Sequence, residues 1–478
     1  GNMDEQLYCE AMTDNAYTKQ PNDATQNIGN GSYSTADPYV KKVWDGRYTG
    51  IRMCNELLEN IDRVPDLDPE LKKRYIGEAK VLRAYNYYEL YTKFGDVPYT
   101  TKVLSIKESM SIARTAKATV IANVLADLDE VINGNYLPTS YDADNKGRIT
   151  RWAAMAIKAK IYLFEGNWTQ VKNITSTIMT EGGFKLFGSY AGLFEIANEY
   201  NSEVILDAQY RPTSREHQMM YVFLPPTLGG YSQLSPLQEL VDSYIMLDGK
   251  TIKETGTSFD ESHPYANRDP RLKATVMYTG NSYTLADGTE VVINCEKGEG
   301  KDGYGVGSDC SATGYYIKKY WDNTYRATLY SGLNPILIRY ADILLMNAEA
   351  LAELGELDKT AWDATIKPIR DRAGFTLASA LEFPEGASKD KLIEIVRNER
   401  RSELALEGHR HKDIIRWRIA DNVLNGWCHG LKTNDVVGTD DGYVRVENRT
   451  FNANKHYLWP IPQAERDLNG NLEQNPNW

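Results

Sequence analysis

Apolar residues recur at the spacing of an amphipathic helix through most of this chain of 478 residues. Two long segments with this pattern cover residues 39–61 and 71–94, and residues 62–69 between them are rich in residues that break helices. We therefore expect the two segments to form a helical hairpin. Further helices are expected over residues 119–132, 151–164, 168–180, 337–354 and 359–373. The chain is predicted to be mainly α.

Small residues recur at corresponding places in three of these segments, at residues 78–84, 156–163 and 347–352. Small side chains allow neighbouring helices to approach closely, and Gly166 and Gly355 mark turns between helices. The pattern is typical of degenerate tetratricopeptide units, in which stacked helix pairs bury a shared core.

The helical spacing stops between residues 190 and 334. Short strand-like runs alternate there with Gly, Asp and Asn, at residues 203–210, 272–278, 290–294 and 315–320. We interpret residues 190–334 as an irregular, partly β insertion within one domain over residues 1–478. An N-terminal helical-repeat part, residues 37–180, precedes it, and a C-terminal helical-repeat part with a tail, residues 335–478, follows it. Because loops on a rigid scaffold often carry binding residues, we expect the ligand site in the insertion.

Tyrosine and tryptophan are frequent relative to phenylalanine, with 32 Tyr and 9 Trp against 10 Phe. Rings that also carry a polar group suit wet binding surfaces. Many of them lie in or just after the insertion: Tyr278, Tyr283, Tyr304, Tyr315, Tyr316, Tyr320, Trp321, Tyr325 and Tyr330. Because successive side chains of a strand face opposite ways, about half of these rings are expected in the core.

Sugars present flat C–H faces that stack on such rings, with hydroxyl groups around the edge. The side chains of Asp322, Asn323 and Arg326 offer paired donors or acceptors for those hydroxyls. The candidate glycan-binding residues in the insertion are therefore Trp321, Tyr325, Tyr278, Tyr283, Asn323 and Arg326.

Charge and hydropathy exclude some partners. A net charge of -12 repels phosphate backbones, so no nucleic acid partner is expected. No apolar run approaches the roughly 20 residues that a spanning helix requires.

No metal site is expected. The histidines of residues 407–411 are two positions apart and cannot share a helix face as those of an HExxH motif do. Residues 142–147 begin like a calcium-binding loop, but its twelfth position is Ala153 rather than Glu, which favours a solvated turn. Whether a structural calcium ion is bound elsewhere stays open. None of the five cysteines forms a CxxC pair, and a disulfide between Cys295 and Cys310 is left open.

Motifs for catalysis are scarce. Glu403 and Glu407 lie one helical turn apart, and paired carboxylates are what glycoside hydrolysis needs. However, in residues 396–407 basic and acidic residues interleave with an apolar stripe, which favours a structural ion-pair network. We predict that the chain is not an enzyme and that it needs no cofactor. Glycoside hydrolase activity is the remote alternative.

Longer motifs occur in a fixed order along the chain. They are residues 39–61 with Trp44 and Asn55, residues 82–85 running to 94–98, Gly147-Arg148 with residues 153–163, residues 235–244 with Asp248-Gly249, Arg268-Asp269-Pro270-Arg271, residues 339–345, Glu399-Arg400 to Arg416-Trp417, and residues 458–462 with Gln474-Asn475-Pro476. Over nearly its whole length the chain closely resembles the SusD/RagB family of Bacteroidetes outer-membrane nutrient-binding lipoproteins.

The resemblance implies a right-handed superhelix of degenerate tetratricopeptide helix pairs with an irregular insertion. It also implies a cell-surface lipoprotein of the outer membrane, whose anchoring cysteine lies upstream of residue 1. Its expected partner is a SusC-like TonB-dependent transporter, which docks on the helical side while the insertion side captures an oligosaccharide. No catalysis is implied. The family's aromatic platform also draws on the loop after the second helix, which corresponds here to the region of Tyr99.

Two other functions stay open from the sequence. The same fold could bind a peptide or another nutrient, in which case a pocket lined with charged groups is expected. The helical repeats could instead belong to an intracellular adaptor, which predicts reduced cysteines and a peptide groove.

Overall fold

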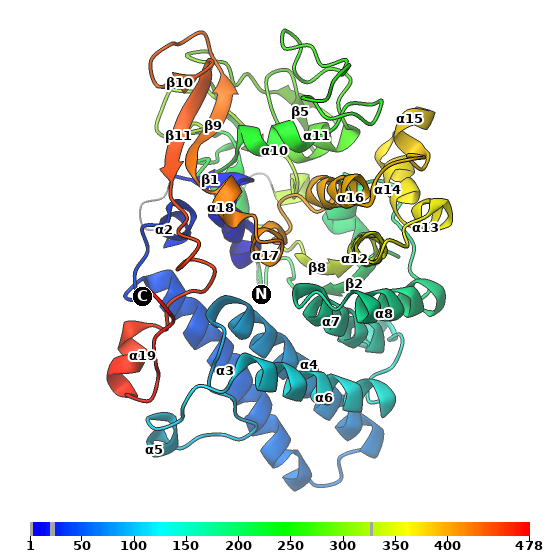
Figure 1. Cartoon of the computed structure of the whole chain (residues 1–478), viewed down its shortest axis with the longest axis vertical. Coiled ribbons are helices and arrows are strands. Elements are labelled where there is room, and N and C mark those ends of the chain that lie inside the picture. The colour runs from blue at the N-terminus through cyan, green and yellow to red at the C-terminus, as the bar shows by residue number, and fades with distance from the viewer. Residues whose placement is uncertain (1–2, 20–23, 326–327) are drawn as a thin grey trace.

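The computed structural model describes residues 3–19, 24–325 and 328–478. Figure 1 shows a lower half built of helices and an upper half in which small sheets and loops lie beside further helices. The first elements are α1 (Met3–Tyr8), β1 (Ala16–Thr18), α2 (Ala24–Asn30), α3 (Pro38–Asn60), α4 (Pro69–Phe94), α5 (Ile106–Ser109), α6 (Lys117–Asn133), α7 (Arg151–Phe164) and α8 (Trp168–Glu181). Within the described ranges, no helix combines the length and the apolar character that crossing a membrane requires.

Local sequence signals explain where the long helices begin. Asp37 caps α3 by accepting hydrogen bonds from the backbone N–H groups of Tyr39 and Val40, and a proline follows in the first turn. Asp68 caps α4 in the same way, again with a proline after it. The side chain of Thr150 caps α7. The predicted helical hairpin is confirmed, and each of its helices starts at an Asp-Pro step.

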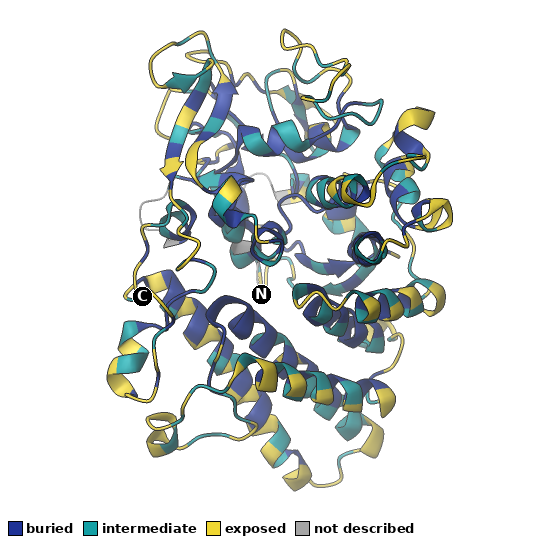
Figure 2. Ribbon diagram, viewed as in Figure 1, coloured by how far each residue is buried: buried dark blue, intermediate teal, exposed yellow. Residues whose placement is uncertain are grey.

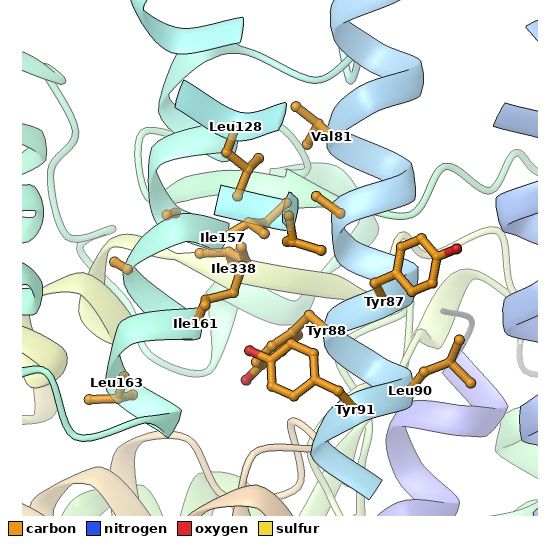
Figure 3. Close-up of a cluster of buried hydrophobic side chains, with 14 of the residues drawn as sticks. Val81, Tyr87, Tyr88, Leu90, Tyr91, Leu128, Ile157, Ile161, Leu163 and Ile338 are labelled. Atoms are coloured by element: carbon orange, nitrogen blue, oxygen red, sulfur yellow. The ribbon is translucent and has the colours of Figure 1, made fainter. Parts of the chain in front are cut away.

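The long helices pack in a continuous row. α3 packs on α4, α4 on α6, α6 on α7 and α7 on α8, and the row continues through α12 (Tyr340–Leu354) to α16 (Lys389–Glu403). Ala156 and Ala159 of α7 are fully buried, as the small-residue pattern predicts. Figure 3 shows part of this core, with Val81, Tyr88, Tyr91, Leu128, Ile157 and Ile161. Figure 2 shows the exposed residues on the outer faces of these helices. The mainly α fold is confirmed.

The insertion has short elements between long loops. They are β2 (Val204–Asp207), α9 (Met219–Phe223), β3 (Leu234–Pro236), α10 (Gln238–Ser243), α11 (Pro270–Thr275), β4 (Val276–Met277), β5 (Ser282–Thr284), β6 (Glu290–Val292) and β7 (Tyr316–Ile317). β1 pairs with β3, β4 with β7 and β5 with β6, and β2 pairs with β8 (Ile336–Arg339), all antiparallel. These small sheets give the insertion the irregular, partly β character that was predicted.

The C-terminal part contains helices and one further sheet. After α12 come α13 (Lys359–Ala364), α14 (Ile366–Ala373), α15 (Ala378–Leu381), α16, α17 (Arg410–Arg416), α18 (Ala420–Val423), β9 (Gly426–Lys432), β10 (Thr439–Asp440), β11 (Tyr443–Arg449) and α19 (Gln463–Leu468). The three strands form an antiparallel sheet in the order β10-β11-β9, at the upper left of Figure 1. The prediction for residues 335–478 was helices and a tail, so this sheet was missed.

Two local predictions were wrong. The expected helix over residues 337–354 begins only at Tyr340, because the residues before it pair with β2 as strand β8. The expected strand over residues 272–278 is mostly helix α11, because Asp269 caps it by accepting the backbone N–H of Arg271 and a proline occupies its first turn.

A buried ion-pair network joins the insertion to the helices. It contains five basic and five acidic side chains: Arg271, Lys319, Arg339, Arg370 and Arg372, with Glu203, Asp269, Glu399, Glu403 and Glu407. The Nη1 atom of Arg339 lies 2.7 Å from Oε1 of Glu203 and 2.6 Å from Oε1 of Glu403, and its Nη2 atom lies 2.7 Å from Oε1 of Glu407. Burial alone would raise the pKa of Glu403, but Arg372 and Arg339 outweigh it and hold that pKa well below its usual range. The predicted structural role of Glu403 and Glu407 is confirmed.

Candidate functional site

The rings predicted for the ligand site divide between core and surface. Four are buried: Tyr283, Tyr315, Tyr316 and Tyr320. Three are half-buried, Tyr278, Tyr304 and Trp321, and Tyr330 is exposed. Half of the rings whose side chains are described therefore lie in the core, as strand alternation predicts.

Tyr283 and Trp321 lie in contact, with ring centroids 5.4 Å apart and planes at 64°. Tyr283 is fully buried, and its hydroxyl donates to the carbonyl oxygen of Ile317 at 2.7 Å. The indole N–H of Trp321 donates to the carbonyl oxygen of Thr284 at 2.8 Å. Tyr283 thus packs beneath Trp321 as a core residue and does not offer its ring to a ligand. The role of Trp321 as a stacking residue stays a prediction.

Tyr278 and Tyr99 lie elsewhere. The ring of Tyr278 stacks on Tyr265 with centroids 4.0 Å apart, at the wall of a separate cleft. Tyr99 packs against Tyr87, a buried ring of α4, with centroids 4.7 Å apart. Tyr99 lies in the chain between α4 and α5, which are in the lower half of Figure 1. Tyr278 lies between α11 and β5, which are in the upper half. The structure does not bring Tyr99 to the other candidates, and its part in binding stays a prediction.

The loop after Trp321 contains the remaining candidates. Asn323 is half-buried at the start of the 3-10 helix η7 (Asn323–Tyr325). Arg326 and the side chain of Tyr325 lie outside the described part of the chain, so their roles stay predictions. Asp322 is buried, and its carboxylate accepts hydrogen bonds from the Thr324 backbone N–H at 3.1 Å and the Ser331 hydroxyl at 2.7 Å. Asp322 therefore holds the two ends of this loop together instead of facing sugar hydroxyls.

Tyr221, Tyr231 and Tyr330 form an aromatic platform, in which Tyr221 is half-buried and the other two rings are exposed. Tyr231 is 47% exposed and Tyr330 is 38% exposed. The Tyr231 ring lies nearly parallel to that of Tyr221, with centroids 5.8 Å apart and planes at 15°. The Tyr330 ring is perpendicular to that of Tyr221, with centroids 6.4 Å apart. Grouped exposed rings mark binding surfaces, and tyrosine adds a hydroxyl that bonds to water or ligand.

Main-chain hydrogen bonds hold the platform together. His217, just before α9, and Ser331 exchange two backbone hydrogen bonds of 2.9 and 3.0 Å. This bridge brings α9, which carries Tyr221, to the loop that carries Tyr330. The backbone N–H of Tyr231 donates to the carbonyl oxygen of Tyr221 at 2.8 Å. Because the rings are positioned before any ligand arrives, binding costs little additional ordering of the chain.

Two glycines shape the turn that returns the chain from Tyr221 to Tyr231. Gly229 has a φ of +83°, in the left-handed region that favours glycine. A Cβ atom on Gly230 would lie 2.1 Å from the carbonyl oxygen of Leu224, so no other residue fits without movement of the backbone. Tyr330 is among the rings noted from the sequence, whereas Tyr221 and Tyr231 were missed. The available signal was the turn itself, in which two prolines and then two glycines separate the two tyrosines.

A second feature of the insertion is a cleft of about 990 Å³ between it and the C-terminal sheet. Tyr265, Tyr278 and Tyr315 of the insertion line the cleft together with Tyr443 of β11. Its walls are joined by ion pairs, which link Lys432 to Glu261 and Lys297 to Asp435.

His429 of β9 fastens the C-terminal sheet to the insertion. Its Nδ1 atom lies 2.7 Å from Oε1 of Glu239 on α10, and its Nε2 atom lies 3.0 Å from Oδ2 of Asp440. The hydrogen bond to Glu239 raises the pKa of His429 above its ordinary value, with Asp440 contributing and partial burial opposing.

We expect His429→Gln to destabilise the protein by an amount that depends on pH. A histidine whose pKa is raised by folding stabilises the fold fully below its unfolded pKa, about 6.5, and this stabilisation is lost as the pH rises through the raised value. The difference in free energy of unfolding between wild type and variant should therefore be larger at about pH 6 than at about pH 9, as measured by urea titration. A difference that does not change with pH would show that His429 contributes by packing alone.

The described residues offer no accessible catalytic pair at Glu403 and Glu407, because both carboxylates are buried in ion pairs. In the part of the chain that the structure describes, no group of three or more His, Cys, Asp or Glu side chains is arranged to hold a metal ion. Cys295 and Cys310 are free thiols, so the disulfide that the sequence left open is not formed.

The chain is similar to known proteins in both its sequence and its fold. The sequence profile described as the SusD family matches residues 193–478, and a profile described as "Starch-binding associating with outer membrane" matches residues 1–163. The chain is 28% identical to SusD-like protein P25 of Formosa agariphila over 439 residues, which cover 85% of this chain and 77% of the relative.

Two solved structures from Bacteroides fragilis are similar along their lengths. A SusD-like carbohydrate-binding protein has a TM-score of 0.87 and 29% identity, covering 98% of this chain and 92% of its own. A second SusD-like protein has a TM-score of 0.84 and 27% identity, covering 99% and 94%. The profile over residues 193–478 alone spans more than half of the chain. The chain belongs to the SusD family.

Proposed function

We propose that this protein captures an oligosaccharide at the cell surface and delivers it to a SusC-like TonB-dependent outer-membrane transporter. The observation that carries the proposal is the exposed platform of Tyr221, Tyr231 and Tyr330 on a chain of the SusD family. Its rings offer apolar faces for the C–H face of a sugar, and their hydroxyls can bond to sugar hydroxyls.

The relatives support a carbohydrate ligand. One structural relative at 29% identity is described as a carbohydrate-binding protein, and the family description for residues 1–163 names starch binding and the outer membrane. Binding of a peptide or another nutrient on the same fold is the alternative. A peptide ligand would call for charged groups at the site, whereas the three rings of the platform are uncharged.

The transporter is proposed to dock on the helical side. The side chain of Asn469 donates to the carbonyl oxygens of Ser109 at 3.1 Å and Ile112 at 2.8 Å, which holds the end of α19 against the α5 segment. Exposed apolar side chains occur on both segments: Ile106 (80%), Met110 (50%) and Leu468 (61%). Exposed apolar side chains at this end of the helical part support a protein partner there. A lipid anchor upstream of residue 1 would hold the chain at the outer membrane.

A panel of polysaccharides and oligosaccharides tests the function. We expect native electrophoresis through gels that contain single polysaccharides to show retardation by at least one glycan, with calorimetry giving the affinity. A peptide mixture serves as the parallel arm. Binding of peptides with no response to any glycan would refute the proposal. Co-precipitation from solubilised outer membranes then tests the transporter, which should be recovered with the full chain.

A further inference from the structure

The cleft between the insertion and the C-terminal sheet is distinct from the aromatic platform. None of the three platform tyrosines lines it, and its volume of about 990 Å³ is in the range of ligand sites. Tyr265 and Tyr278 stand on one wall as a stacked pair, with planes at 16°, and Tyr443 stands on the other. The cleft therefore has its own aromatic surfaces.

A chain of hydrogen bonds fixes the polarity of the cleft wall. The side-chain amide N–H of Gln238 donates to Asp242 at 2.7 Å, which identifies its other atom, Oε1, as the acceptor. The Tyr315 hydroxyl donates to that oxygen at 2.5 Å, so its own oxygen accepts the proton of the Tyr265 hydroxyl, 3.2 Å away. The Tyr265 oxygen can then still accept a hydrogen bond, and Tyr265 is one of the residues that line the cleft. It suits a ligand that donates hydrogen bonds.

The charged side chains that line the cleft also favour a ligand that donates hydrogen bonds. Both lysines of the lining are already paired, Lys432 with Glu261 and Lys297 with Asp435. Glu296 and Glu299 are exposed in the lining and form no ion pair with another described residue. These carboxylates accept hydrogen bonds and repel anions.

We infer that this cleft is a second saccharide site, which takes an uncharged or amino-bearing oligosaccharide and rejects acidic ones. Sugar hydroxyls and ammonium groups supply the donors that Tyr265 and the two free carboxylates require, and the tyrosine rings take the C–H faces of the sugar. The inference rests on the proposed function only in taking the ligand to be a saccharide.

Calorimetry on the full chain tests the site in a Tyr231→Ala background, which weakens the platform. The probes are xylohexaose and laminarihexaose as uncharged sugars, the glucosamine hexamer as a cation and the galacturonate hexamer as an anion. We expect at least one uncharged or cationic probe to bind the Tyr231→Ala chain. Adding Tyr278→Ala should weaken this binding about tenfold or more, and adding Tyr265→Phe should weaken it several-fold by removing one acceptor. The galacturonate hexamer should not bind to this background.

The outcomes separate the two sites. Three outcomes would each overturn the cleft assignment. In the first, Tyr231→Ala abolishes the binding of every probe that the wild type binds. In the second, the binding that remains in Tyr231→Ala is unchanged by Tyr278→Ala and by Tyr265→Phe, and in the third, the galacturonate hexamer binds to Tyr231→Ala. An affinity that Tyr231→Ala leaves unchanged but Tyr278→Ala abolishes would support the cleft assignment and refute the platform. No binding of any of these probes by the wild type would overturn the cleft assignment, whereas the platform is tested by the broader glycan panel. Tyr265→Phe keeps the ring and removes only the hydroxyl. The melting temperature of each variant is measured as well, so that a loss of affinity can be told apart from a loss of folding.

Discussion

Arg339→Met is expected to lower the free energy of unfolding by about 3 to 5 kcal/mol, because it leaves the buried network with one more carboxylate than basic side chains, even though Glu203, Glu403 and Glu407 each keep another basic partner. Arg339 contacts Glu203, Glu403 and Glu407 inside a network in which basic and acidic side chains are equal in number. None of these four side chains is more than 1% exposed, so water cannot replace the lost partner. Urea titration followed by circular dichroism measures the change.

Two comparisons isolate the charge effect. Arg63→Met removes an exposed arginine whose side chain bonds, among the described residues, to Asn60 alone, and it should cost less than about 0.5 kcal/mol. Adding Glu407→Gln to Arg339→Met restores equal numbers of charges and should recover part of the stability. A loss below about 1 kcal/mol for Arg339→Met would contradict a dry, charge-balanced network.

Tyr231→Ala is expected to weaken glycan binding by about 1 to 3 kcal/mol, or roughly 5- to 150-fold in Kd, while the fold stays intact. Tyr231 is the most exposed ring of the platform and lies parallel to the ring of Tyr221. Its truncation removes one stacking face but keeps the backbone hydrogen bond to Tyr221, which does not involve the side chain. Calorimetry with a glycan identified by the panel measures the loss.

Controls match the ring and its exposure. Tyr231→Phe keeps the stacking face and should retain most of the affinity, so any loss reports on the hydroxyl. Trp427 of β9 is 44% exposed, close to the 47% of Tyr231, and lies outside the platform. Trp427→Ala should leave platform binding unchanged. Equal losses from Tyr231→Ala and Trp427→Ala would show that the platform is not where the glycan stacks.

The helices were predictable because their signals are local. The helix over residues 151–164 coincides with α7, and the starts of α3 and α4 follow from Asp-Pro steps. The three-stranded C-terminal sheet was missed although it has a local signal, since Asp441-Gly442, both with positive φ, form the two-residue turn that joins β10 to β11. The strand β8 has no such signal, because its partner β2 lies on the other side of the insertion.

The candidate site was predictable in kind but not in detail. Tyrosine-rich composition and the position of the insertion pointed to exposed rings, and Tyr330 is one of them. Tyr283 and Tyr330 look alike in the sequence, yet one is fully buried and the other is 38% exposed. Their difference depends on which neighbours cover each ring, and no local pattern encodes that.

By itself the sequence determined the mainly α class and the structural role of the charged segment that contains Glu403 and Glu407. These features follow from periodicity, capping residues and charge interleaving, which act over a few neighbouring residues. Only the tertiary structure decided that Tyr221, Tyr231 and Tyr330 meet in one platform, and that a cleft opens beside Tyr265 and the C-terminal sheet. Those arrangements depend on contacts such as the His217 and Ser331 bridge, whose partners are far apart along the chain.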